Sequence, residues 1–417
     1  MLKRMSYRLV LPVLTALAVL SSCQKEEQAG EASRQRISFN CQPVVDVTTR
    51  AHASLIKGIE PVPGQKFGVY AWNTGASPLS ANPGAPGFIT DLAVTFANNN
   101  DQGKNNSYTP LIPDNMSDLM DQYWPRPTDP GYAVYDYSFA AYYPIVAGGA
   151  ITPSFGTANT VGVYSFNTPS TAASMVDFCV SDIANDQVYG HTNTAWDGTV
   201  GLTFHHMLTR VQIKFVKARD VASDFDIHIV DAKLEDVLST GTLTATYIPD
   251  IDDTDPGNVL IYPGTTEFTW SGKANYRDYE ITIGGVNPGP YDPDDPPANL
   301  DGLTLVSLGW ESGSTDADVF LLIPQDMLPR PTPGSSAKAH AIHFWWTAED
   351  SDTVMDTILY LDECVTGIGV ETPANIDWGR NQFVTYNVVI RAKPIEFDLE
   401  ASIKAWDDEE GYYSIVD

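Results

Sequence analysis

Residues 395–405 read Ile-Glu-Phe-Asp-Leu-Glu-Ala-Ser-Ile-Lys-Ala, the longest regular pattern in the chain. Apolar residues occupy every second position, which predicts a β-strand with one buried and one solvated face. Residues 37–47, near the other end of the chain, alternate in a similar way and place five side chains on one face: Ile37, Phe39, Cys41, Val45 and Val47. Two half-buried strands of similar length are therefore expected at opposite ends of the chain.

Shorter strand-like runs separated by Gly, Pro and Asn fill the space between these ends. Residues 137–143 are apolar on both faces, so they should form a central strand that ends at Pro144. Residues 113–122 are the one candidate for a helix. This spacing of strands and turns predicts an all-β fold with two tandem β-sandwiches and few short helices. We place the division in an acidic loop, with one sandwich over 51–250 and the other over 251–417.

The first 23 residues predict export rather than a transmembrane anchor. A basic start is followed by the apolar run Leu9–Leu20, which is too short to span a bilayer as a helix. The run ends in Leu-Ser-Ser-Cys, the pattern of a lipobox, so Cys23 is expected to carry lipid and to become the new N-terminus. Residues 24–50 then form a tether and a first, removable strand. Residues 24–27, Gln-Lys-Glu-Glu, resemble a short acidic tag that exports lipoproteins to the outer face of the outer membrane. We therefore expect an outer-membrane lipoprotein at the cell surface, held to the membrane only through its lipid.

Charge and cysteine content exclude several classes of function. The 417 residues carry a net charge of −29, so no surface is available to neutralise the phosphates of nucleic acid. After lipidation of Cys23, three cysteines remain, namely Cys41, Cys179 and Cys364, and none forms a Cys-x-x-Cys pair. Neither a disulfide framework nor a zinc site is therefore indicated, and we expect all three to fill structural positions.

No catalytic motif, metal site or cofactor-binding motif is recognisable, and the protein is not expected to be an enzyme. His205 and His206 are neighbours on a predicted strand, so their side chains should point to opposite faces. The acidic loops 250–255 and 292–295 are interpreted as solvated rather than as calcium sites. A secreted hydrolase would need clustered acids or a triad in a pocket. A monomeric glycan-binding lipoprotein would need exposed aromatic residues, whereas we expect three aromatic pairs to lie in the core: Tyr123-Trp124, Tyr142-Tyr143 and Trp345-Trp346.

The two terminal strands suggest assembly by strand exchange. Removing an edge strand from a sandwich leaves an apolar groove and unpaired backbone groups that another chain's strand can fill. The first strand is followed by Thr-Thr-Arg-Ala, and cleavage between Arg50 and Ala51 would remove the lipid anchor and that strand together. A neighbour's terminal strand could then enter the groove, which would produce head-to-tail growth of a polymer.

The order of several motifs resembles the fimbrillin family along nearly the whole chain. They are the lipobox, Ile-Ser-Phe at 37–39 leading to Thr-Arg-Ala at 49–51, and the segments 67–72, 137–144, 176–178, 202–211, 322–325 and 395–406. The resemblance implies transthyretin-like sandwiches, trimming after Arg50 by an Arg-specific protease, and polymerisation into a type V pilus with other pilus subunits. The subunit could be structural or adhesive, and an adhesive subunit would bind a receptor on a host or bacterial surface.

The resemblance further implies a donor strand near the C-terminus, drawn from Ile395, Phe397, Leu399, Ile403, Tyr413 and Ile415. Two segments remain open as the inserting piece. Either residues 395–405 insert, or residues 411–417 insert while 395–405 stay within their own domain.

Overall fold

The computed structural model describes residues 37–43, 66–75, 84–95, 107–108, 124, 136–145, 150–155, 160–187, 199–218, 225–248, 265–283, 285–297, 299–308, 319–348, 351, 353–366, 377–391 and 396–405. Within these ranges the chain is built almost wholly of β-strands. Two short 3₁₀ turns, η2 (Ala172–Ser174) and η3 (Leu361–Glu363), are the helical elements of these ranges. Among the described residues, no helix has the length and apolar character needed to cross a membrane.

Eight strands form an N-terminal sheet. Their order is β3 (Ile89–Thr95), β2 (Lys66–Gly75), β5 (Asp136–Tyr143), β8 (Cys179–Ser181), β10 (Thr199–His206), β1 (Ser38–Pro43) and β4 (Ser107–Tyr108), with β9 (Ala184–Gln187) paired to β5. The side chains of residues 137–143 on β5 are buried on both faces of the sheet. This confirms the prediction of a central strand that ends at Pro144.

Five strands form a C-terminal sheet. Their order is β15 (Val319–Leu322), β11 (Thr209–Lys217), β19 (Gln382–Arg391), β20 (Glu396–Ala405) and β18 (Val365–Thr366). The apolar alternation of β11 continues that of β10 after a break at Met207 and Leu208. That break sends the chain out of the N-terminal sheet, and β11 then pairs in parallel with β19.

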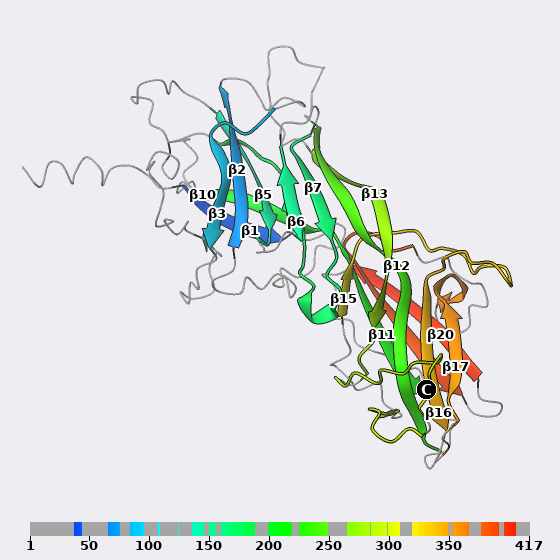
Figure 1. Cartoon of the computed structure of the whole chain (residues 1–417). Coiled ribbons are helices and arrows are strands. Elements are labelled where there is room, and N and C mark those ends of the chain that lie inside the picture. The colour runs from blue at the N-terminus through cyan, green and yellow to red at the C-terminus, as the bar shows by residue number, and fades with distance from the viewer. Residues whose placement is uncertain are drawn as a thin grey trace, which may run out of the picture.

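A third sheet is common to both halves of the molecule, and we call it the shared sheet. Its order is β17 (Met355–Tyr360), β16 (Ala341–Ala348), β12 (Ile227–Ile248), β7 (Gly162–Asn167) and β6 (Ile151–Ser154), with β13 (Thr265–Glu280) and β14 (Val306–Ser307) also paired to β12. Figure 1 shows the long strands β12 and β13 running from one half of the molecule into the other.

The shared sheet divides the interior into separate cores. The end of β12 around Leu243 packs with β6, β7 and one face of the N-terminal sheet, whereas its beginning around Ile229 packs with β16 and the C-terminal sheet. Between these two regions the pairing of β12 with β13 is interrupted by two register shifts, and Asp236 adopts a positive φ of 59°. Such bulges bend and twist a strand, which lets one long strand serve two sandwiches.

The predicted all-β fold with sandwiches is confirmed. The structure also shows which strands belong to which sandwich. β11 and the first half of β12 precede residue 250, yet they pack in the C-terminal sandwich. The predicted division between residues 250 and 251 lies outside the described residues and stays a prediction. The helix predicted over residues 113–122 also lies outside the described residues.

Candidate functional site

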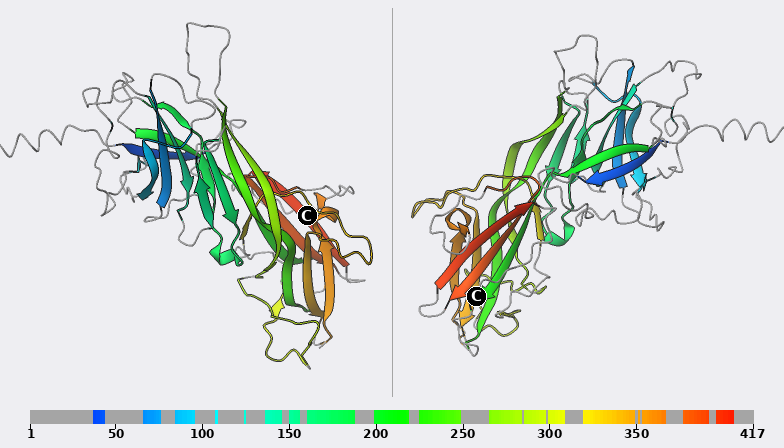
Figure 2. Two further views of the ribbon diagram at one scale, coloured as in Figure 1. Left: turned by 45° about the horizontal axis from the view of Figure 1, so that its top comes forward. Right: turned by 180° about the vertical axis from the view of Figure 1, so that it is seen from behind.

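The first strand, β1, fills a position near one edge of the N-terminal sheet. It pairs in parallel with β10 along its whole length, from Ser38 opposite Thr199 to Pro43 opposite Phe204. On its other side, β1 pairs with the two-residue strand β4, which is its one partner there among the described residues. The two views of Figure 2 agree in placing β1 beside β10. Most of the N-terminal sheet therefore lies on one side of β1. We call the position of β1, between β10 and β4, the slot.

β10 depends on β1 for much of its backbone pairing. On the side away from β1, β10 pairs with β8 only through residues 204–206. Among the described strands, β1 is therefore the pairing partner of residues 199–202 of β10. Removing β1 would leave these backbone N–H and C=O groups without their ladder, and unpaired edge groups attract a replacement strand.

Side chains of β1 and of the residue before it complete an aromatic core. Ile37, which directly precedes β1, is 1% exposed, and Phe39 on β1 is 0% exposed. The Phe39 ring contacts the rings of Phe67 and Phe139 edge-on, with centroids 6.1 and 5.9 Å apart. Phe67 in turn contacts Phe204 on β10 at 5.9 Å. Burying one large apolar side chain stabilises a fold by about 1.5–3 kcal/mol, so an empty slot would be costly and would favour refilling.

The strand predicted as a donor, β20, is an integral part of the C-terminal sandwich. It pairs with β19 along its whole length, from Glu396 opposite Arg391 to Ala405 opposite Gln382. The Phe397 ring packs against two rings of β16, and Leu399 is 8% exposed. Ile403, by contrast, is 43% exposed. Within the part of the chain that the structure describes, the outer edge of β20 pairs with β18 at residues 400 and 401.

Several residues singled out from the sequence lie outside the described residues. These are the lipidation residue Cys23, the cleavage residues Arg50 and Ala51, the first-strand residues Val45 and Val47, and the C-terminal residues Ile395, Tyr413 and Ile415. The backbone of Cys41 is described within β1, but its side chain is not. Their predicted roles stay predictions.

A cluster of three polar side chains lies near the slot of β1, at the C-terminal end of β10. His206 stands directly opposite Cys179 of β8, and Asp177 lies two residues before Cys179. The Nδ1 atom of His206 is 3.6 Å from the Cys179 Sγ atom and 3.0 Å from Oδ1 of Asp177. Burial, and then the Asp177 carboxylate, raise the pKa of the Cys179 thiol to about 12. Tyr143 of β5 is the cross-strand partner of Cys179. Burial, and then the Asp177 carboxylate, also raise the pKa of the Tyr143 hydroxyl.

Sequence reasoning missed this cluster because it considered His205 and His206 as a pair with each other. The two side chains do differ in environment: His205 is paired with Asp182 at 2.8 Å, and His206 with Asp177 at 2.9 Å. The spacing Asp-x-Cys at 177–179 was an available signal, since residues two apart in an extended segment share a face. The pairing of β8 with β10, which supplies the histidine, has no local signal.

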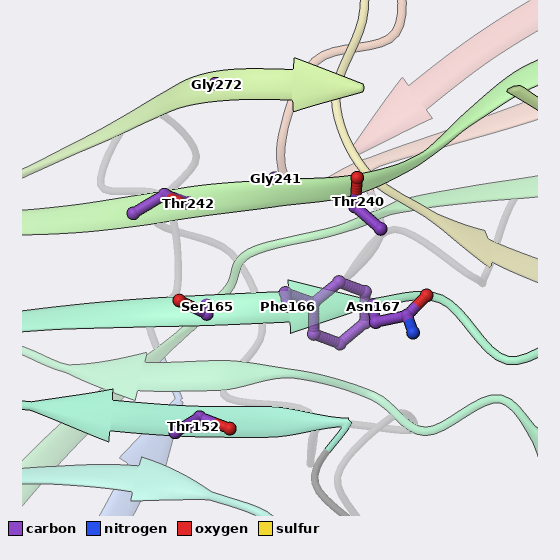
Figure 3. A pocket seen from close by; sticks show the side chains of 8 residues that line it. All are labelled: Thr152, Ser165, Phe166, Asn167, Thr240, Gly241, Thr242 and Gly272. Carbon is purple, nitrogen blue, oxygen red and sulfur yellow. The ribbon is translucent and has the colours of Figure 1, made fainter. Parts of the chain in front are cut away.

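A shallow hollow lies on the surface of the shared sheet. It has a volume of about 310 Å³ and crosses β6, β7, β12 and β13. Figure 3 shows the residues that line it, which are Thr152, Ser165, Phe166, Asn167, Thr240, Gly241, Thr242 and Gly272. This lining contains hydroxyl and amide groups but no carboxylate, imidazole or thiol.

The aromatic pairs that were predicted to fill the core are buried where they are described. Trp124, Tyr142, Tyr143, Trp345 and Trp346 are all between 1% and 7% exposed. Tyr123 lies outside the described residues. None of these five rings is therefore available as a flat, exposed platform for stacking on a sugar.

Comparison with family models gives a match that covers more than half of the chain. A family model described as fimbrillin-like matches residues 49–292. No curated protein matches the chain in sequence.

Among solved structures, the fold is similar to a fimbrial protein from Bacteroides vulgatus, with a TM-score of 0.46, 17% identity, and coverage of 88% of this chain and 99% of the other. A candidate cell adhesion protein from Bacteroides uniformis has a TM-score of 0.43 and 13% identity, with coverage of 89% and 99%. The tip fimbrial protein Mfa3 from Porphyromonas gingivalis has a TM-score of 0.35 and 9% identity, with coverage of 89% and 99%. At these scores the structural likenesses carry no conclusion about function.

Proposed function

This chain belongs to the fimbrillin-like family, and on that premise we propose that it is a structural or adhesive subunit of a cell-surface fimbria that polymerises by donor-strand exchange. In this proposal the precursor is exported as an outer-membrane lipoprotein through Cys23. An Arg-specific protease then cuts between Arg50 and Ala51, which releases the lipid anchor and β1 together. The mature subunit reaches the cell surface with an open slot and joins other pilus subunits.

The placement of β1 is the observation that carries the proposal. β1 is short, ends seven residues before Arg50, and completes both the backbone ladder of β10 and the aromatic core around Phe39. A strand whose removal leaves one defined slot, and whose connection to the body is cut by one cleavage, suits replacement by a strand from another subunit. Parallel pairing with β10 sets the direction that an identical replacement would take.

We favour residues 411–417, which include Tyr413 and Ile415, as the segment that inserts. Phe397 and Leu399 already pack in the core of their own sandwich, and β20 is hydrogen-bonded to β19 throughout. Withdrawing β20 to serve a neighbour would open that core at the cost of several buried side chains. The proposal therefore keeps residues 396–405 in place and assigns donation to the residues that follow.

The experiment compares Arg50→Ala with Arg36→Ala, which removes an arginine on the other side of β1. The Arg50→Ala protein should stay lipid-bound, folded and monomeric because its own β1 still occupies the slot. The wild type and the Arg36→Ala control should both form ladders that resist SDS after protease treatment. Ladders of equal length from the Arg50→Ala protein would show that β1 is not the strand that is displaced.

Lipidation is tested separately so that the two steps can fail independently. Replacing Cys23 with Ala should abolish metabolic labelling with palmitate and leave the precursor unprocessed. Labelling that persists in the variant would overturn the lipoprotein assignment without affecting the strand-exchange proposal.

The alternative is a surface lipoprotein that binds glycans as a monomer. It receives less support, because the described members of the three aromatic pairs that could have stacked on sugars are buried. A receptor on a host or bacterial surface is compatible with either function, and binding of glycans by protein that never polymerises would favour the alternative.

A further inference from the structure

Three side chains with different metal-binding chemistry meet at the junction of β8 and β10. Cys179 is 0% exposed and His206 is 4% exposed, while the Asp177 side chain is 12% exposed and faces the rim of the cluster. The backbone sets the positions of two of these side chains, because His206 is the cross-strand partner of Cys179. Asp177 lies two residues before Cys179, in the segment that leads into β8. Paired strands therefore position Cys179 and His206, and the start of β8 positions Asp177 beside them.

The distances within the cluster agree with those between the ligands of one ion. A tetrahedral zinc ion with bonds of about 2.3 Å to sulfur and about 2.0–2.1 Å to nitrogen holds those two atoms about 3.5 Å apart. The Sγ atom of Cys179 and the Nδ1 atom of His206 are 3.6 Å apart. The carboxylate of Asp177 lies on the other side of Nδ1 at 2.9 Å, so it would withdraw by a few tenths of an ångström to bind the same ion. All three ligand atoms lie within 4.8 Å of one another.

The hydrogen bonding of the Asp177 carboxylate gives a second reason to look for a ligand. Its buried Oδ2 atom and its Oδ1 atom face the same donor, since Nδ1 of His206 lies 2.9 Å from Oδ2 and 3.0 Å from Oδ1, and a single N–H hydrogen-bonds to Oδ1. Buried carboxylate oxygens are ordinarily hydrogen-bonded or bound to a cation. A divalent cation would satisfy this oxygen and would also neutralise a Cys179 thiolate.

We propose that Asp177, Cys179 and His206 bind one Zn²⁺ ion, with a fourth position open toward the rim. The thiolate and imidazole ligands select a borderline metal such as zinc over Ca²⁺ or Mg²⁺, which require oxygen ligands. Binding releases the Cys179 thiol proton to solvent, and His206 binds as the neutral tautomer with its proton on Nε2. The ion links β8 to β10 next to the slot of β1 and so stabilises the edge of the sheet that a replacement strand would join.

The test uses the full chain purified without a histidine tag, treated with a chelator and then titrated with Zn²⁺ or Co²⁺. The wild type should bind one equivalent of zinc and unfold at a higher temperature when zinc is present. Cobalt should produce the thiolate-to-metal absorption band in the near ultraviolet. Cys179→Ser should lose that band, and Asp177→Asn should bind zinc at least about tenfold more weakly.

Two variants serve as matched controls. Cys364→Ser removes the buried thiol of the other sandwich, and His205→Gln removes the neighbouring histidine that pairs with Asp182. Both should bind zinc like the wild type. Because Asp177 reaches the rim, Asp177→Asn should fold even if a core substitution at Cys179 does not, and circular dichroism checks this. The proposal is overturned if the wild type shows no saturable one-to-one binding, or if Cys179→Ser and Asp177→Asn bind zinc as tightly as the two controls.

Discussion

At the scale of single residues, His340 shows how burial sets the charge of a side chain. It is 0% exposed, and its Nδ1 atom accepts a hydrogen bond of 2.9 Å from the backbone N–H of Leu328. The proton must therefore be on Nε2, which donates to Oε1 of Gln325 at 2.9 Å. Burial lowers the pKa of His340 from 6.5 to about 4, although Asp236 and Asp362 oppose the shift. A proton on Nδ1 would break the contact with Leu328.

This arrangement predicts a loss of stability in mild acid. The folded-state pKa lies below the unfolded value, so the unfolded chain binds the proton more readily. The contribution of His340 is fully present above pH 6.5 and is lost as the pH falls toward about 4. The gap between the two pKa values corresponds to about 3 kcal/mol.

Urea unfolding between pH 7 and pH 4 checks this prediction. His340→Gln should show a shallower pH dependence than the wild type, whereas His228→Gln, at a surface site beside Ser307, should not. An identical slope for the wild type and His340→Gln would contradict the neutral, buried state of His340.

At the scale of elements, β1 and β10 stabilise each other. β1 supplies the backbone partner of residues 199–202 of β10 and places Phe39 among the rings of the N-terminal sheet. The energetic contribution is concentrated in few residues, because β1 has only six. A single substitution should therefore loosen the whole strand.

Phe39→Ala should destabilise the uncleaved protein by about 3–5 kcal/mol, the usual cost of truncating a buried phenylalanine. Hydrogen exchange measured by mass spectrometry should become faster in β1 and in residues 199–202 together, with a smaller change in β5. Ile403→Ala on β20 is the control, since that side chain is 43% exposed and should cost little. Faster exchange in β1 without any change in β10 would show that β10 does not depend on β1.

At the scale of the whole molecule, β12 couples the two sandwiches. Ile229 and Leu243 are both 0% exposed, yet the first belongs to the C-terminal core and the second to the core beneath the N-terminal sheet. One continuous strand thus contributes to two interiors, and its bulges near Asp236 accommodate the change of direction. Unfolding of either sandwich should therefore destabilise the other, because both contain part of β12.

This coupling predicts that the two sandwiches unfold together. Ile229→Ala and Leu243→Ala should each lower the stability of a single shared transition by about 2–5 kcal/mol. Urea unfolding followed by hydrogen exchange of β5 and β19 checks this, because each strand reports on a different half. Ile358→Ala, at a 40% exposed position of β17, is the control and should change little. Two separate transitions, each moved by only one variant, would show that the halves are independent.

Alternation and turn residues were sufficient to predict the class of the fold and many of its strands. The strand at residues 137–143 and the burial of Trp345 and Trp346 both follow from local composition. Such predictions succeed because the burial of every second side chain is a property of an extended backbone and requires no knowledge of its neighbours.

The amino-acid sequence by itself determined that the chain is an all-β protein with half-buried strands near both ends. The tertiary structure alone decided which strands became neighbours: β1 beside β10 in parallel, β20 within its own sandwich, and His206 opposite Cys179. Pairing between distant strands uses backbone groups that are the same in every residue, so it leaves little local trace. Register is instead selected by how whole faces pack together, and packing exists only once the sheets have formed.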